Sequence, residues 1–246
     1  MNLLAFDTST ERISAAVQRG DARWRYDGAG GPQASETLIP ALLDLLAQAG
    51  LALTDLDALV FGRGPGSFTG LRTACAVAQG LALGAALPVL PVDTLLALAE
   101  DAHRQAATPG AARVLALLDA RMDQVYAAAY VRAGGAWQAA GGMTVCAPEA
   151  IALPDDGAQT GAQSADWVLA GNIFAPAAAY GDRLPPPLRA LPRIHALPTA
   201  DALLALAPAR LAQGLAVAAQ DALPLYIRDK VALTTAERRA AQAGQP

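Results

Sequence analysis

One short pattern occurs twice in the chain, and it constrains the fold more than any other feature of the sequence. Leu3–Asp7 is an apolar run that ends in an aspartate, and a polar turn then leads into a returning apolar segment. Leu115–Asp119 is followed by a similar turn and return, 112 positions later in a chain of 246 residues. Short apolar runs that end at turn-forming residues predict buried strands. The repeat therefore predicts two related lobes rather than a solenoid of short units, the alternative being chance similarity between two hairpins.

The first lobe is expected to open with a three-stranded meander and to continue as alternating helices and strands. Ser35 or Thr37 can cap a helix that should end near Gly50. The strands are predicted at 3–6, 12–17, 22–26, 58–61 and 89–91, and a second helix, of small residues, at 67–84.

The second lobe should repeat the hairpin and add two short strands, at 136–140 and 167–170. The segment ALPDDGAQTGAQSADW between them is loop-like. Prolines in 181–198 exclude a helix or a central strand there. A helix is predicted over 200–214, broken or kinked at Pro208.

These elements divide the chain into an N-terminal lobe at 1–105, which carries the expected dimer surface, and a C-terminal lobe at 106–246. The helix near 200–214 is expected to pack back on the first lobe. The charged tail from Arg228 is expected to fray.

Composition excludes several classes of protein. Hydrophobic residues make up 54% of the chain and charged residues 16%, which excludes disorder over most of its length. No basic segment precedes the first apolar run, so we expect no signal peptide and a cytoplasmic protein. The uncharged stretch at 73–92 is long enough for a membrane span. Its glycines and prolines favour a buried helix followed by a buried strand, so we expect no membrane association.

Charge, cysteines and histidines limit the chemistry further. The net charge of -4 argues against a chain that binds nucleic acid alone through a basic surface. Cys75 and Cys146 form no disulfide or zinc pattern. His103 and His195 lie far apart and in no metal-ligand spacing, so we assign no metal to this chain.

Four glycines crowd the segment FGRGPGSFTGLRTA at 61–74, between an apolar strand and a helix of small residues. The segment lacks the lysine of a Walker A loop, the third glycine of a dinucleotide fingerprint and the flanking glycines of a serine elbow. Flexible glycines before a helix N-terminus can still accept an anion. The alternative is a tight strand-to-helix connection in which Ser67 or Thr69 only caps the helix.

The aspartates that end the two repeated strands are candidates as well. Asp7 could bind magnesium or act as a base, or it could only cap the turn that follows; for Asp119 we favour capping. The candidate contacts for an anion or a nucleotide are Asp7, Thr8, Ser9, Gly64, Gly66, Ser67 and Thr69.

Four stretches together resemble the TsaB family of bacterial subunits for tRNA threonylcarbamoyladenosine synthesis, formerly grouped with glycoproteases. They are LLAFDTST at 3–10, LVFGRGPGSFTGLRTA at 59–74, LLDARMDQVYAAAY at 117–130 and PLYIRD at 224–229. The resemblance covers essentially the whole chain. It implies an α/β fold with two lobes and a duplicated mixed-sheet core, of the actin-like, sugar kinase and heat-shock ATPase type.

The resemblance also implies a chain without a catalytic site. TsaD, the catalytic relative, has two metal-binding histidines in a P-V-H-H-M-E-G-H pattern after the equivalent strand. The corresponding run begins at Pro91 and puts Thr94 and Leu98 at the histidine positions. Leucine cannot coordinate a metal and threonine is a poor replacement for imidazole. We therefore expect no cofactor on this chain, and expect ATP with magnesium and the active-site metal on partner subunits.

Two helices are candidates for a partner surface. The helix at 37–49 is apolar on most of its circumference, which predicts that it is covered on two sides, although its own lobe could supply the second cover. The small residues of 67–84 would allow another helix to approach closely. The resemblance implies that this surface pairs with TsaD, and about 800 Å² per partner would give a specific complex. The expected interface residues are Leu38, Leu42, Leu45, Leu71, Cys75 and Ala78.

The leading prediction is a non-catalytic subunit that supports threonylcarbamoylation of N6 of adenosine 37 in tRNAs that read ANN codons. The implied partners are a TsaD-type transferase and a TsaE-type ATPase, with tRNA reached only through the complex. The isolated chain could also form a homodimer through the same helices. The alternative is a nucleotide-dependent phosphotransferase of the actin and sugar kinase superfamily, with Asp7, Thr8 and Ser9 at the phosphates.

Overall fold

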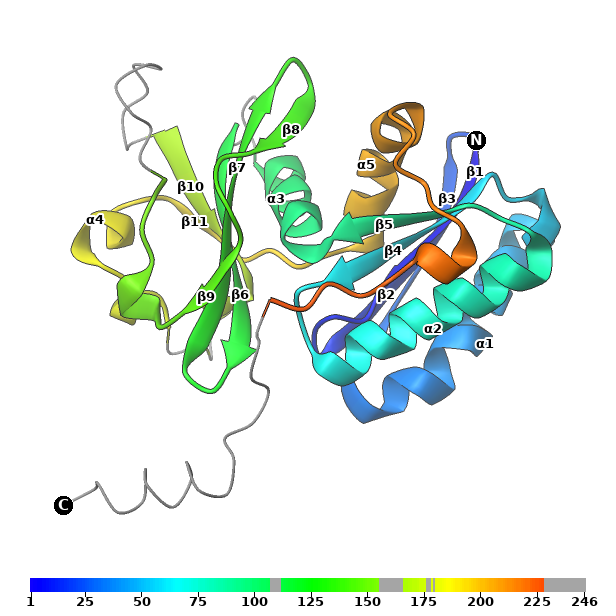
Figure 1. The fold of residues 1–246 in the computed structure, drawn as a ribbon, viewed down its shortest axis with the longest axis horizontal. Helices are drawn as coiled ribbons and strands as arrows, with labels where there is room; N and C mark the ends of the chain where they lie inside the picture. Colours follow the sequence, from blue (N-terminus) through cyan, green and yellow to red (C-terminus); the bar gives the residue numbers. More distant parts are fainter. Residues whose placement is uncertain (107–111, 155–165, 176–177, 179, 228–246) are drawn as a thin grey trace.

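Two lobes, each built on a mixed β-sheet, make up the molecule (Figure 1). The computed structural model describes residues 1–106, 112–154, 166–175, 178 and 180–227. The N-terminal lobe holds the segments up to β5, and the second sheet forms the C-terminal lobe.

The first sheet has the strand order β3-β2-β1-β4-β5. Its meander consists of β1 (Asn2–Asp7), β2 (Arg12–Arg19) and β3 (Ala22–Ala29), which pair antiparallel. Parallel strands β4 (Ala58–Gly64) and β5 (Val89–Asp93) extend the sheet beyond β1. The central strand β1 is buried from Leu3 onward, as its continuous apolar run predicts.

Two long helices cover one face of this sheet (Figure 1). Helix α1 (Ala34–Ala49) packs on β2, and α2 (Phe68–Ala85) packs on β4. Gly50 ends α1 in the left-handed conformation that glycine adopts without strain, at φ 64°. Both helices lie within a few residues of their predicted ranges. The predicted cap of α1 is wrong, because the helix begins at Ala34 and Ser35 and Thr37 lie inside it.

The second sheet repeats this topology, with the order β11-β10-β6-β7-β8. Strands β6 (Arg113–Arg121), β7 (Gln124–Ala133) and β8 (Ala136–Ala139) form its meander, and β10 (Trp167–Ala170) and β11 (Arg193–Ile194) run parallel to β6. A further strand pairs with β7, namely β9 (Thr144–Cys146). The predicted α/β fold of two lobes with a duplicated mixed-sheet core is confirmed.

Two helices, α3 (Thr94–Gln105) and α5 (Ala200–Ala212), lie between the sheets and share one hydrophobic core with both of them (Figure 1). Helix α5 comes from the second half of the chain but packs on β1 and β2 of the first sheet. Helix α3 comes from the first half but packs on β6 of the second sheet and on α5. Each half of the chain therefore contributes a helix that packs on the sheet of the other half, and these two helices join the lobes.

Three sequence expectations need correction. No helix was predicted at α3, because its residues were compared only with a metal-binding pattern. The proline-rich stretch does contain a helix, the four-residue α4 (Pro186–Arg189), which prolines can begin because the first turn lacks backbone acceptors. Helix α5 is not broken at Pro208 but continues to Ala212, since burial of the preceding turns from Ala202 to Ala207 holds it in place.

Two further expectations concern the predicted loop and tail, and a possible membrane span. Most of the predicted loop at 152–167 and the tail from Arg228 lie outside the described residues. Within the described part of the chain, no helix combines the length and the hydropathy of a membrane span. The uncharged stretch at 73–92 instead forms most of α2 and the start of β5.

Because α5 is shared by both lobes, we predict that a cavity in its packing destabilises the molecule as one unit. Leu203 is fully buried in the core between the sheets, so Leu203→Ala should lower the free energy of unfolding by about 2 to 5 kcal/mol. Urea denaturation followed by tryptophan fluorescence would report both lobes, through Trp24 on β3 and Trp137 on β8. Leu223→Ala, at a side chain that is 61% exposed, is the control. Two separate transitions would contradict a shared core.

Candidate functional site

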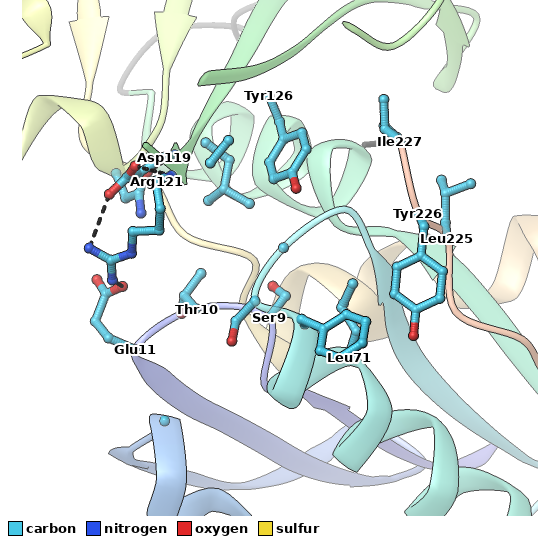
Figure 2. A pocket seen from close by; sticks show the side chains of 17 residues that line it. Ser9, Thr10, Glu11, Leu71, Asp119, Arg121, Tyr126, Leu225, Tyr226 and Ile227 are labelled. Atoms are coloured by element: carbon cyan, nitrogen blue, oxygen red, sulfur yellow. Dashed lines mark hydrogen bonds and ion pairs between the residues drawn. The ribbon is translucent and has the colours of Figure 1, made fainter. Parts of the chain in front are cut away.

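A cavity of about 300 Å³ lies where the two lobes meet (Figure 2). The turn after β1 and the start of α2 line it from the first lobe, and the turn after β6 lines it from the second. The segment Leu225–Ile227, near the end of the described chain, forms a further wall. The site therefore joins segments that are far apart in the sequence.

Asp7 organises the turn behind this cavity. Its Oδ1 accepts hydrogen bonds from the backbone amide of Ser9 (2.8 Å) and from the Ser9 hydroxyl (2.6 Å). Its Oδ2 lies against Gly62, where the Cβ of any larger residue would overlap it. Burial raises the pKa of Asp7 to about 6, although the hydrogen bonds from Ser9 lower it. Asp7 thus caps its own turn.

The glycine-rich loop packs directly on this turn. The Ser67 amide donates to the carbonyl of Ser9 (2.7 Å), and the Thr8 hydroxyl donates to the carbonyl of Gly70 (2.7 Å). A Cβ at Gly70 would overlap the carbonyl oxygen of Thr8, and one at Gly66 would meet the backbone of Ser9. These glycines allow the close approach, and Ser67 accepts from the Gly70 amide as the helix cap.

The structure brings only part of the predicted anion-binding set to the cavity. Ser9, Gly66 and Ser67 line it. The remaining four, Asp7, Thr8, Gly64 and Thr69, are not among its lining residues. Asp7 and Thr8 are buried behind the turn, whereas Thr69 is exposed on α2.

The second lobe contributes a charged rim. Asp119 accepts hydrogen bonds from the backbone amide of Arg121 (2.7 Å) and from the Tyr180 hydroxyl (3.2 Å), so it caps its turn as Asp7 does. The Arg121 guanidinium pairs with Asp119 at 3.2 Å and lies 3.9 Å from Glu11 of the first lobe. Figure 2 shows these three charged side chains together on one side of the cavity.

Sequence reasoning missed several lining residues. Tyr126 on β7 is only 8% exposed, and its hydroxyl points toward Ser9 in Figure 2. Asn172 accepts a hydrogen bond from the Asp119 amide (2.9 Å) and also lines the cavity. Tyr126 lies in the repeated hairpin, inside the stretch LLDARMDQVYAAAY that carries the family resemblance, but sequence reasoning assigned it no role. No motif marks Asn172.

The stretch PLYIRD was noticed in the sequence without a role for its residues. Leu225 donates its amide to the carbonyl of Arg63 (2.7 Å), which fixes this segment to the end of β4. The Tyr226 ring lies 5.7 Å from the Phe68 ring, and the Arg72 guanidinium stacks on Phe68 at 3.8 Å. The segment thereby closes one side of the cavity, a role that only a long-range contact could reveal.

The six side chains expected at a partner interface are buried within this chain, which corrects the choice of residues. On α1, Leu38, Leu42 and Leu45 face the sheet and are at most 2% exposed. The α2 residues are Leu71, Cys75 and Ala78, each at most 6% exposed. The chain's own segment at 219–222 covers part of α2, since the Cys75 thiol donates to the carbonyl of Ala222 (2.9 Å). The exposed faces of both helices therefore carry different residues.

Thr94 and Leu98, which occupy the positions of the metal-binding histidines of TsaD, have structural roles in this chain. The Thr94 hydroxyl accepts a hydrogen bond from the Gly64 amide (3.1 Å). Leu98 is fully buried in the core between the sheets. In the described ranges, no three or more His, Cys, Asp or Glu side chains are grouped so that they could hold a metal ion.

We predict that the burial of Asp7 makes stability fall as pH rises from about 4 to about 6. The folded state keeps the proton to higher pH than the unfolded chain, with a pKa of about 6 against 3.8. This difference corresponds to about 3 kcal/mol. The asparagine side chain of Asp7→Asn cannot ionise. The free energy of unfolding of this variant minus that of the wild type should therefore increase by about 3 kcal/mol from pH 4 to pH 7.

Urea denaturation at several pH values would measure this change, with Asp21→Asn at an exposed turn as the matched control. A wild-type to Asp7→Asn difference that does not vary with pH would contradict the burial effect.

Comparisons with known proteins agree with the resemblance seen in the sequence. The family model described as "TsaD: tRNA N6-adenosine threonylcarbamoyltransferase" matches residues 31–236. The tRNA threonylcarbamoyladenosine biosynthesis protein TsaB of Escherichia coli K12 is 37% identical over 233 residues, which cover 94% of this chain and 96% of the relative. TsaB of Haemophilus influenzae is 42% identical over 132 residues, 54% of this chain and 55% of that protein.

The solved structure of YeaZ from Pseudomonas aeruginosa has the same fold, with a TM-score of 0.79 and 40% sequence identity. The match covers 92% of this chain and 99% of that one. The two-lobed fold is therefore shared with that protein, and the chain belongs to the TsaB family.

Proposed function

We propose that this chain is a non-catalytic subunit of the machinery that makes threonylcarbamoyladenosine in tRNA. The observation that carries the proposal is its similarity, over nearly the whole length, to a protein named for that biosynthesis. In this proposal a TsaD-type partner transfers the threonylcarbamoyl group to N6 of adenosine 37 in tRNAs that read ANN codons. A TsaE-type ATPase and tRNA join through the complex, and the partners supply ATP, magnesium and the active-site metal.

Two features of the structure support a role without catalysis in this chain. The positions that would carry the metal-binding histidines hold a threonine that bonds to Gly64 and a leucine inside the core. The Oδ1 of Asp7 accepts from Ser9, its Oδ2 is buried against Gly62, and Asp7 does not line the cavity. The phosphotransferase alternative would need Asp7 free at the phosphates.

The exposed face of α1 and α2 supports a partner that packs on both helices. Ile39 and Leu43 of α1 are 41% and 51% exposed, and Leu83 of α2 is 76% exposed. They lie on adjacent helices that cover the outer face of the first sheet. Isolated apolar side chains are ordinary on a surface, but three large ones exposed on two neighbouring helices favour an interaction site there.

The glycines of α2 add to this argument. A Cβ at Gly80 or at Gly84 would meet nothing within 4 Å in the described part of the chain, which therefore gives no packing reason for either glycine. Glycine in a helix interior costs up to about 1 kcal/mol relative to alanine. Close approach of a helix from a partner would explain both positions. The same face would also let two copies of this chain pair in the absence of that partner.

We predict that depletion of this protein lowers threonylcarbamoyladenosine in bulk tRNA. Mass spectrometry of tRNA nucleosides would measure the level, and re-expression of the wild type should restore it. Unchanged levels after depletion would contradict the proposed function. Restoration by the Asp7→Asn variant would support the absence of a catalytic role for Asp7.

We also predict that Gly80→Ala has opposite effects on folding and on pairing. The isolated chain should gain up to about 1 kcal/mol of stability, because alanine is the better helix former. Binding to the TsaD-type partner should weaken by roughly 5-fold to 100-fold, as expected when a methyl group overpacks a close contact. Denaturant unfolding and calorimetric titration would measure the two quantities.

Leu43→Arg on the exposed face of α1 should abolish co-elution with the partner while the chain stays folded. Ala139→Arg, at an exposed position of β8 on the other lobe, is the matched control. Normal pairing of both Gly80→Ala and Leu43→Arg would rule out this face as the partner surface.

A further inference from the structure

We propose that the cavity between the lobes binds a small organic carboxylate. The carboxylate group would lie at the start of α2 beside Tyr126. The apolar body would lie against Leu71, Leu118 and Ile227, which line the same cavity. This inference is independent of the proposed role in tRNA modification, because it rests only on the chemistry of the lining.

The start of α2 offers hydrogen-bond donors to an anion. The first amides of a helix have no acceptor within the helix. Ser67 Oγ accepts from the Gly70 amide, and the Leu71 amide donates to the Ser67 carbonyl. Among the described residues, no hydrogen bond is made by the amide of Phe68, which lines the cavity. The dipole of this 18-residue helix further favours a negative charge at its N-terminus.

Tyr126 provides independent support for a ligand. More than nine-tenths of the residue is buried, yet its hydroxyl makes no hydrogen bond to another residue in the described part of the chain. Among the described residues, the hydroxyl is not one of the fully buried polar atoms that lack a partner, so it is open to the cavity. A phenylalanine would fill the same space without a polar group. The hydroxyl points into the cavity, toward the turn on which α2 begins (Figure 2). A ligand oxygen there would satisfy it.

The charges and the volume of the cavity restrict the ligand. Glu11 and Asp119 lie on one side and would repel an anion, and Arg121 between them offsets part of their charge. A head group with a single negative charge is therefore favoured over a phosphate with two. About 300 Å³ is at the lower end of small-molecule sites, which favours a compact body over a nucleoside triphosphate.

Calorimetric titration of the full-length protein with benzoate, phenyl phosphate and benzyl alcohol would test the assignment. These probes share one aromatic body and differ in the charge of the head group. We expect benzoate to bind at least tenfold more tightly than benzyl alcohol, and phenyl phosphate to bind more weakly than benzoate. Tyr126→Phe should weaken benzoate binding by roughly tenfold or more, as expected for loss of a hydrogen bond to a charged group. Tyr26→Phe, on β3 outside the cavity, is the matched control.

Four results would overturn the proposal. They are no benzoate binding at millimolar concentration, equal binding of benzyl alcohol, tighter binding of phenyl phosphate, and an unchanged affinity in Tyr126→Phe. Amide chemical shifts would locate the probe separately, since benzoate at this site must perturb Phe68 and Thr69. Shifts confined to other residues would also contradict the assignment.

Discussion

The start of α2 and the turn after β1 meet with no space for a side chain between them, and much of the structure depends on that contact. The Thr8 carbonyl lies where a Cβ of Gly70 would be, and two hydrogen bonds join the segments at Ser9 and Gly70. This contact fixes where α2 begins. It therefore sets the direction in which α2 crosses the sheet and the position of its exposed face. It also places the helix N-terminus at the mouth of the cavity.

The duplicated fold gives the two lobes equivalent turns but different chemistry. Asp7 and Asp119 both cap the turn after the central strand of their sheet. Asp7 is almost completely buried and keeps its proton to a pKa of about 6, whereas Asp119 remains paired with Arg121 at the rim. The second lobe consequently contributes the Asp119–Arg121 ion pair to the cavity, and Leu225–Ile227 close another side. The duplicated fold places the two turns on either side of the cavity, and the sequence differences between the lobes determine which side chains line it.

Helices α1 and α2 show why a partner surface is difficult to predict from one sequence. Leu42 and Leu43 are adjacent and equally apolar, yet Leu42 is fully buried and Leu43 is 51% exposed. A helix that is apolar around most of its circumference has two candidate inner faces, and periodicity alone does not choose between them. The sheet beneath α1 and the chain segment at 219–222 across α2 make that choice. The sequence pattern nevertheless indicated correctly that α1 is apolar on two sides.

Local patterns in the sequence determined the strands of both meanders, the end of α1 at Gly50, the Ser67 cap of α2, the duplication and the family. Each of these depends on residues within one turn or one strand, or on a repeat that is visible by alignment. Tertiary structure alone decided the exchange of α3 and α5 between the lobes, the burial of Asp7 and the position of Tyr126 in the cavity. It also decided the role of PLYIRD, whose Leu225 pairs with Arg63. The physical reason is that burial, and the partner of a backbone amide, depend on segments that are far apart in the sequence, whereas helix caps and strand periodicity depend on neighbouring residues.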